Sequence, residues 1–231
     1  MELNKKKPQA IIDVILFFAI SSLIYIIYGL NAKSIVAFIT DKSIDVFIRT
    51  FAVCFSHFCQ AGAAFVFLML IRREKFSEFG LAKHNLLPCI ARSSLLLLAY
   101  ESILFIRGYW RLFYPFKVLS VSEELISSSP FFITIIGAVL FTIICGFFES
   151  FNYIYIVKKL DQLFPVKNVF LRPGPIIVSI LGYIGHALMG VTGWEGTLPF
   201  LFLLYGALVV YEKTENAWGC VGIFFLIWFT L

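Results

Sequence analysis

Long runs of apolar residues, separated by short polar segments, recur along the whole chain. Several runs reach the roughly 20 residues that a helix needs to cross a bilayer. The pattern therefore predicts seven helical spans. They are Ala10–Leu30, Ile44–Ile71, Leu86–Ile106, Phe131–Val157, Pro175–Met189, Thr197–Val210 and Ala217–Leu231. The second and fourth are long enough to tilt, and the last three are near the lower limit for a crossing.

Composition places the chain in the same class. Of its 231 residues, 60% are hydrophobic and 14% are charged, and the mean hydropathy is +0.91. A soluble domain is about half apolar and a quarter charged. We therefore expect an all-α fold, a polytopic membrane helical bundle that forms a single transmembrane domain over residues 1–231. The first run is too long for the core of a signal peptide and lacks a small-residue cleavage site, so no removable signal peptide is expected.

The net charge of +5 follows from short basic loops between the runs, which is the positive-inside pattern and does not indicate nucleic-acid binding. The basic clusters before the first span and after the second, fourth and sixth fall on one side if the N-terminus is cytoplasmic. The loop from Arg107 to Ser129 is an exception, and its mixture of basic and aromatic residues favours an interfacial segment. The Phe-rich, Lys-biased composition suggests a multi-pass protein of a bacterial inner membrane. The five cysteines form no CxxC pair and are expected to be small packing residues.

One acid interrupts the most apolar part of the chain, the stretch CGFFESFNYIYIV, in which Glu149 is surrounded by aromatic and aliphatic residues. Glu149 lies about 12 Å from the cytoplasmic end of the fourth span, and His186 lies about 16 Å into the fifth. The two side chains are thus expected at the same depth on consecutive helices. Ionisable residues in a membrane face a bundle interior or a wet cavity, which makes this pair a candidate site. A purely structural hydrogen bond between them is the alternative.

Two motifs around these residues resemble those of the CAAX-protease and bacteriocin-processing (CPBP) family of intramembrane metalloproteases, which includes the type II CAAX prenyl endopeptidases. The family pattern is EExxxR on one span, FxxxH on the next and HxxxN on the last. Here the chain reads ESFNYI, so Glu149 is kept, Ser150 replaces the second Glu and Ile154 replaces the Arg. In GYIGH, His186 matches the motif histidine and Gly182 replaces its Phe.

Two further segments extend the resemblance. The stretch EKTENAWGCVGIFFLIWF is similar to the start of the family's last helix, and it places Phe224 at the position of the His and Trp228 at that of the Asn. Upstream, KFSEFGLAKHNL resembles the FxxLGL segment found between early spans of the family. The resemblance covers residues 76–229, which we describe as a CAAX-protease-like core.

The resemblance implies peptide hydrolysis inside the membrane, which needs a base to activate water and a group to hold the oxyanion. Glu149 would be the base, and His186 would hold the water or polarise the carbonyl. A zinc site needs about three protein ligands and an open position. Only Glu149 and His186 are available at this depth, since His57 is estimated to lie about 22 Å from the cytoplasmic end of its span. No cofactor is therefore expected, and zinc is the alternative, with Glu149 and His186 as its ligands. Phe224 and Trp228 would fill the cavity on the oxyanion side.

Two nearby charges need separate interpretations. The pair Glu123-Glu124 is not expected near His186 and is interpreted as an interfacial loop or a helix N-terminal charge pair. Arg92 would either approach Glu149, in place of the missing Arg, or extend to the interface.

Three functions are compatible with these patterns. The first is a CAAX-protease-like protein with weakened or lost proteolysis that acts as a membrane scaffold or regulator and binds the transmembrane segment of a partner. The second is an active glutamate-dependent intramembrane endopeptidase that uses Glu149 and His186. The third is a transporter component with the same pair as an ion relay, but the sequence contains no inverted repeat that would support it.

Overall fold

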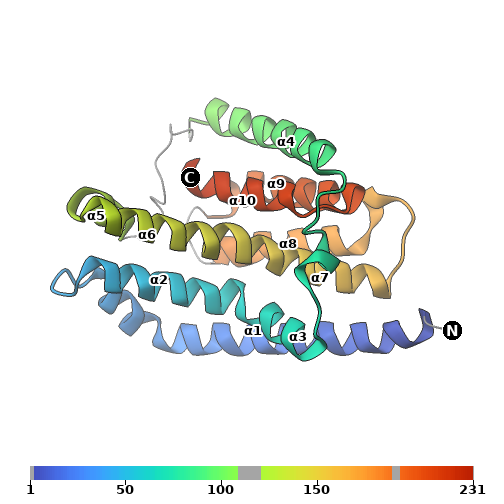
Figure 1. Ribbon diagram of the computed structural model, residues 1–231, viewed down its shortest axis with the longest axis horizontal. Helices are drawn as coiled ribbons and strands as arrows, with labels where there is room; N and C mark the ends of the chain where they lie inside the picture. Colours follow the sequence, from blue (N-terminus) through green and yellow to red (C-terminus); the bar gives the residue numbers. More distant parts are fainter. Residues whose placement is uncertain (1–2, 109–120, 189–192, 231) are drawn as a thin grey trace.

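The computed structural model describes residues 3–108, 121–188 and 193–230, and these parts of the chain contain helices and no strand. Most helices lie along one long axis, so that the molecule is an elongated bundle (Figure 1). We call the end at which α1 begins the N-terminal end and the opposite end the α5 end. Every apolar run expected to form a helix is helical, which confirms the all-α fold class.

The first apolar run forms α1 (Leu3–Thr40), which is longer than predicted. The second run is not one tilted helix. It is divided into α2 (Val46–Ala61) and α3 (Ala63–Arg72), which meet at a bend of 59°. Gly62 stands at the bend, where a Cβ would come within 2.6 Å of the Phe58 ring. A glycine at this point lets the chain turn sharply, which is a usual cause of a helix kink.

The middle of the chain begins with the 3₁₀ turn η1 (Phe76–Phe79) and α4 (Leu86–Ile106), whose bounds match the prediction. The short helix α5 (Ser122–Ser128) follows residues 109–120, so the aromatic and basic part of the predicted interfacial loop lies outside the described residues. The fourth run forms α6 (Phe131–Phe141), the π-helical segment η2 (Thr142–Phe148) and α7 (Glu149–Leu163), one after another without a loop.

The remaining runs form α8 (Pro173–Leu188), which follows the 3₁₀ turn η3 (Val169–Leu171), and then α9 (Gly193–Thr214) and α10 (Trp218–Thr230). The largest group of buried apolar side chains joins α7, α9 and α10 with α3 and α4, and it includes Phe151, Ile154, Leu204, Leu208 and Phe224. Four of the five cysteines are buried, as expected for packing residues.

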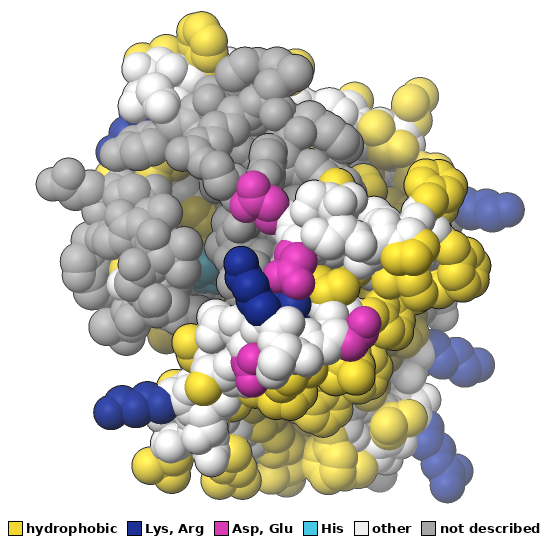
Figure 2. All heavy atoms as spheres, turned by 90° about the vertical axis from the view of Figure 1, so that its left-hand side faces the viewer, with side chains coloured by type: hydrophobic (Ala, Val, Ile, Leu, Met, Phe, Trp, Pro, Cys, Tyr) yellow, Lys and Arg dark blue, Asp and Glu magenta, His cyan; other side chains and the backbone are white. Residues whose placement is uncertain are grey.

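Three helical stretches are long and apolar enough to cross a membrane, namely Lys7–Thr40, Leu86–Ile106 and Phe131–Leu163. The bent pair α2–α3 makes a fourth if it counts as one span. Apolar side chains cover much of the outside of the bundle. At the α5 end, acidic side chains gather near the centre beside a basic one, and further Lys and Arg side chains project at the edge (Figure 2). This distribution supports a membrane protein.

Two segments at the opposite ends of residues 76–229 meet at the N-terminal end of the bundle. The turn between α9 and α10 binds the loop between η1 and α4, since the Asn216 side chain donates to the carbonyls of Ala82 and His84 at 2.9 and 2.6 Å. The Ala217 N–H donates to the Gly80 carbonyl at 2.8 Å. These contacts hold the start of α10 in place.

Gly80 is expected to be essential for this junction. Its φ of 85° is in the left-handed region, and a Cβ would lie 2.8 Å from the Glu215 carbonyl oxygen. We expect Gly80→Ala to lower the free energy of unfolding by about 2 kcal/mol or more, because strain and a backbone clash add together. Thermal unfolding in detergent would measure this. Gly29→Ala is the matched control, because a Cβ added at Gly29 would meet no neighbouring segment within 4 Å and alanine is a better helix former; an equal loss in both variants would contradict the argument.

Candidate functional site

Glu149 begins α7 directly after the π-helical segment η2, and only 3% of its surface is exposed. A π-helical turn inserts an extra residue and changes which side of the helix the following residues face, and such segments often occur at functional sites. Gly146, within η2, packs against α10, since a Cβ added there would be in ordinary contact with Phe225 Cα at 3.4 Å. The local backbone thus directs a carboxylate into the bundle rather than toward its outside.

His186 lies on α8 beside this carboxylate, as the depth estimate predicts. Its Nε2 is 3.9 Å from Glu149 Oε1, which is an ion-pair distance but longer than a hydrogen bond. Its Nδ1 is 2.8 Å from the Gly182 carbonyl oxygen, which only accepts hydrogen bonds, so Nδ1 carries a proton. In the neutral imidazole the lone pair is then on Nε2, the nitrogen that faces Glu149.

His57 is the second histidine at Glu149, which corrects the prediction that it lies too far from the cytoplasmic end of its span. Its Nε2 is 3.2 Å from Glu149 Oε2. The depth estimate assumed that the second span is one straight helix, but α3 is bent by 59° from α2 and so adds less height than a straight continuation would. His57 is only four residues from Ala61, the end of α2, and so reaches the level of Glu149.

The carboxylate therefore lies between two imidazoles that come from α2 and α8, one at each oxygen. The Tyr153 side chain, one turn further along α7, lies close to the same carboxyl group. The Glu149 side chain is 4% exposed, but those of His57 and His186 are 22% and 32% exposed. Figure 2 shows a histidine side chain visible below the surface of the α5 end. The carboxylate is thus shielded from the surroundings, while both imidazoles are partly exposed.

The positions at which the sequence departs from the family motifs are mostly packing positions. Ser150 is buried, and its hydroxyl donates to the Phe147 carbonyl at 2.9 Å. Ile154 is fully buried in the apolar core. At Gly182 a Cβ would lie 2.6 Å from Leu204 Cδ2, so the Phe of the family motif would not fit. Trp228 belongs to α10, but its side chain lies outside the described part.

Phe224 is fully buried. Its ring is 5.3 Å from that of Tyr153 and 6.4 Å from that of Phe200. Phe200 in turn packs 4.3 Å from the His186 ring. An apolar layer therefore covers one side of the site, and the polar side faces α2.

The charges that were considered beside the site lie elsewhere. Arg92 is exposed on α4, which agrees with its extension to the interface. Glu123 and Glu124 are in the first turn of α5, as the helix N-terminal interpretation predicts. Glu124 pairs with Arg49, a buried guanidinium that also donates to the carbonyls of Ile44 and Ile39. This pair was not predicted because Glu124 is 75 residues away from Arg49 in the chain.

A second buried cluster at the N-terminal end was also missed. Asp13 of α1 accepts hydrogen bonds from Arg72 at 2.7 Å and from Lys159 at 2.9 Å, and Lys159 also pairs with Glu74. Asp13 is fully buried and Lys159 is 3% exposed. A charge just inside an apolar run was the only sequence signal for this network, which ties α1 and α3 to α7.

The family resemblance implies a metal ion, and the geometry does not favour one. In the part of the chain that the structure describes, no group of three His, Cys, Asp or Glu side chains is arranged to hold a metal ion. His57 and His186 face different oxygens of Glu149. We therefore derive no step that depends on a metal.

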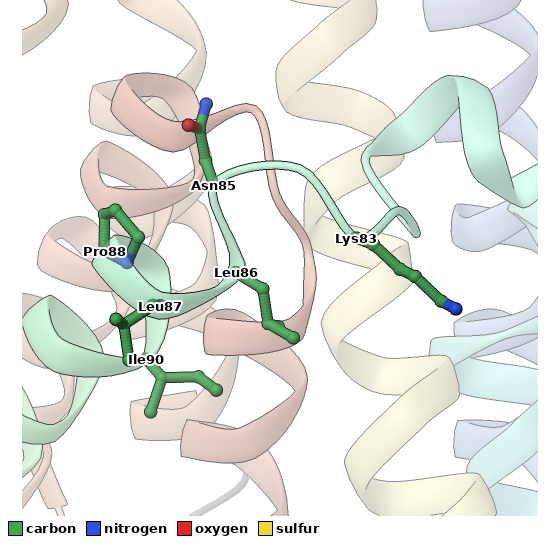
Figure 3. Close-up of a pocket in the computed structure, with 6 residues that line it drawn as sticks. All are labelled: Lys83, Asn85, Leu86, Leu87, Pro88 and Ile90. Carbon is green, nitrogen blue, oxygen red and sulfur yellow. The ribbon is translucent and has the colours of Figure 1, made fainter.

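Two cavities at the N-terminal end lie outside this site. One, of about 480 Å³, is lined by Lys83, Asn85, Leu86, Leu87, Pro88 and Ile90. Its side chains point in different directions, with Lys83 directed away from the others (Figure 3), so they do not converge on a ligand. The other has a volume of about 800 Å³ and is lined by charged residues of α7, α9 and the loop before α8.

The resemblance of this chain to other proteins therefore rests on its short sequence motifs alone. Comparisons with protein-family models, with curated proteins and with solved structures found no match for it, so the kinship with the CAAX-protease family stays a prediction.

Proposed function

We propose that this protein is a multi-pass membrane protein that hydrolyses peptide bonds within the bilayer at a centre formed by Glu149, His57 and His186. We further propose that the bundle crosses the inner membrane of a bacterium seven times, with a cytoplasmic N-terminus. A single observation carries the functional proposal: a buried carboxylate lies between two imidazoles inside a bundle of apolar helices. Ionisable groups at such depth are costly unless they are paired, and they commonly serve a function.

The reaction needs few groups. Glu149 accepts a proton from a water molecule while the water oxygen attacks the carbonyl carbon of the peptide bond. The negative charge that develops on the carbonyl oxygen is stabilised by an N–H donor, for which a protonated His57 or His186 is suited. The C–N bond then breaks, and Glu149 gives its proton to the departing amine. The products are a carboxylic acid and an amine, and Glu149 returns to the ionised state.

His57 changes the balance between the alternatives that the sequence leaves open. With Glu149 and His186 alone, the loss of the motif His and Asn leaves one donor beside the base. The contact of 3.2 Å between His57 and Glu149 adds a second imidazole, which is supplied by α2 instead of α10. The centre therefore has one base and two groups that can donate a hydrogen bond when protonated.

A membrane scaffold or regulator is the second candidate, and the packing of Phe224 favours it. This ring is fully buried against Tyr153 and Phe200, at the position where the resemblance would place a histidine. In a scaffold, the centre would serve to hold α2, α7 and α8 together and the bundle would bind the transmembrane segment of a partner.

The two candidates are separated by comparing cells that express the wild type, Glu149→Ala or His186→Ala. We expect newly formed protein termini in the membrane fraction to disappear in both variants, because each removes a reacting group. Mass spectrometry of termini measures this, and a pull-down from the same cells measures partner binding. Lost termini with retained binding support hydrolysis, whereas unchanged termini in both variants would refute it and leave the scaffold.

A further inference from the structure

The second cavity, of about 800 Å³, contains a group of charged side chains that the proposed reaction does not use. Asp161 comes from the end of α7, Glu212 from the end of α9, and Arg172 from the residue just before α8. All three line the cavity. They lie where the ends of these helices meet, at the opposite end of α8 from His186.

Direct contacts join the three helices at this point. Arg172 Nη1 pairs with Glu212 Oε2, and Arg172 Nε donates to the Val166 carbonyl at 3.1 Å. Asp161 Oδ1 accepts the N–H of Gly174, the second residue of α8, at 2.8 Å. A Cβ on Gly174 would lie 2.6 Å from that oxygen, so the close approach of α8 to Asp161 requires glycine.

The other oxygen of Asp161 needs a donor. Asp161 Oδ2 is buried and accepts no hydrogen bond from the N–H and O–H groups of the described residues. The Glu212 carboxyl lines the same cavity and interacts with Asp161. A carboxyl group donates a hydrogen bond only when it is protonated. Because a buried acceptor without a donor is costly, a proton on Glu212 completes the arrangement.

Glu212 is suited to holding that proton near neutral pH. It lies beyond the predicted span, which ends at Val210, and its side chain is 9% exposed. Burial raises the pKa of Glu212 to about 7, and the charge of Asp161 adds to this effect while Arg172 opposes it. Like-charged carboxyl groups in contact commonly share one proton.

The remaining charged groups around the cavity are less directly involved. Lys158 of α7 donates to the Glu78 main-chain carbonyl, which directs its ammonium toward η1. Tyr211 belongs to the end of α9, and Glu215 follows the last residue of that helix. Lys167 lies in the loop before α8, and His84 lies in the loop before α4. Glu215 is exposed and therefore provides a matched control for Glu212.

We propose that Asp161, Glu212 and Arg172 form a proton-operated latch that fixes the start of α8 against the ends of α7 and α9. With the proton present, Glu212 donates to Asp161, and Asp161 holds Gly174. When the proton leaves, two carboxylates face each other with one guanidinium between them, and Asp161 Oδ2 loses its donor. The start of α8 is then released toward the cavity.

The latch predicts how stability changes with pH. The pKa of Glu212 is about 7 in the folded protein and 4.5 in the unfolded chain, so the folded state binds the proton more tightly. Its contribution is complete below about pH 4.5 and is lost as the pH rises to about 7. Glutamine mimics the protonated acid. We expect Glu212→Gln and wild type to unfold at the same temperature at pH 5, and the variant to unfold at least about 4 °C higher at pH 8.

Movement of α8 is measured separately by hydrogen–deuterium exchange. We expect the protection of the amides of Gly174, Ile176 and Ile177, corrected for intrinsic rates, to fall at least about tenfold between pH 6 and pH 8 in the wild type. Glu212→Gln should remain protected, and Glu215→Gln should behave as the wild type. Protection that stays constant with pH in the wild type, or an equal fall in Glu212→Gln, would overturn the latch.

A second measurement covers the case in which Glu212→Gln does not fold. Isotope-edited infrared spectroscopy of the wild type should show the carbonyl band of a protonated Glu side chain that disappears near pH 7. A glutamate population that is already ionised at pH 5 would also overturn the proposal. Neither measurement uses hydrolysis, so these results are independent of the proposed function.

Discussion

Purified protein with Glu149 replaced by glutamine is expected to hydrolyse membrane-embedded peptides at least about 10³-fold more slowly than the wild type. Glutamine keeps the size of the side chain and can still contact His57 and His186. It cannot accept the proton of the attacking water, so the base is lost while the packing remains. Cleavage of a fluorogenic peptide in liposomes, compared under single-turnover conditions, would measure the difference in the chemical step.

Two comparisons make this result specific. Glu123→Gln removes an exposed acid of α5 and should leave the rate unchanged. His57→Gln should lower the rate about 10²-fold or more if the imidazole contributes a proton or a hydrogen bond to the transition state. A rate in Glu149→Gln equal to that of the wild type would exclude Glu149 as the base. A rate in His57→Gln equal to that of the wild type would limit the centre to the pair expected from the sequence.

Replacing Asp13 by alanine is expected to cost about 3–5 kcal/mol of stability, the largest effect outside the site. Asp13 is fully buried and is the shared partner of Arg72 and Lys159. Its removal takes from Arg72 the carboxylate with which it pairs in this network. Lys159, which is 3% exposed, keeps Glu74 as its acidic partner. Breaking one partner of a buried ion pair is costly because the remaining charge stays buried.

Unfolding in mixed micelles, followed by circular dichroism, would measure this loss. Asp13→Asn keeps an oxygen that accepts hydrogen bonds and should lose less than Asp13→Ala. Asp41→Asn, at an exposed position after α1, should change the stability by less than about 0.5 kcal/mol. If Asp13→Ala and Asp41→Asn were equally stable, the network would contribute nothing to holding α1 against α7.

The helices could largely be predicted from the sequence because long apolar runs in a membrane protein have few alternatives to a helix. The bounds of α4 are those predicted, and those of α8 differ by one or two residues at each end. The bend at Gly62 could not be predicted, because the apolar pattern continues through it and the bend depends on local packing against Phe58. The π-helical segment before Glu149 could not be predicted either, because it does not change the apolar pattern.

The same limit explains which part of the site was found. Glu149 and His186 lie on helices that run without a bend between the interface and the site, so counting residues was enough to place them at one depth. His57 lies on a bent span, where counting residues overestimates height, and it was wrongly excluded for that reason. Arg49, Asp13 and Lys159 were missed because their partners are 75, 59 and 146 residues away in the chain.

The sequence by itself determined that this chain forms apolar helices and that an acid and an imidazole stand at matching depth on two of them, since both follow from local pattern and helical rise. Tertiary structure decided that α2 brings His57 to the same acid, that Phe224 closes the other side, and that Asp161 and Glu212 share the end of the bundle. These outcomes depend on bends of the backbone and on contacts between distant segments. Neither a bend nor a distant contact changes the hydrophobic pattern from which the helices were predicted.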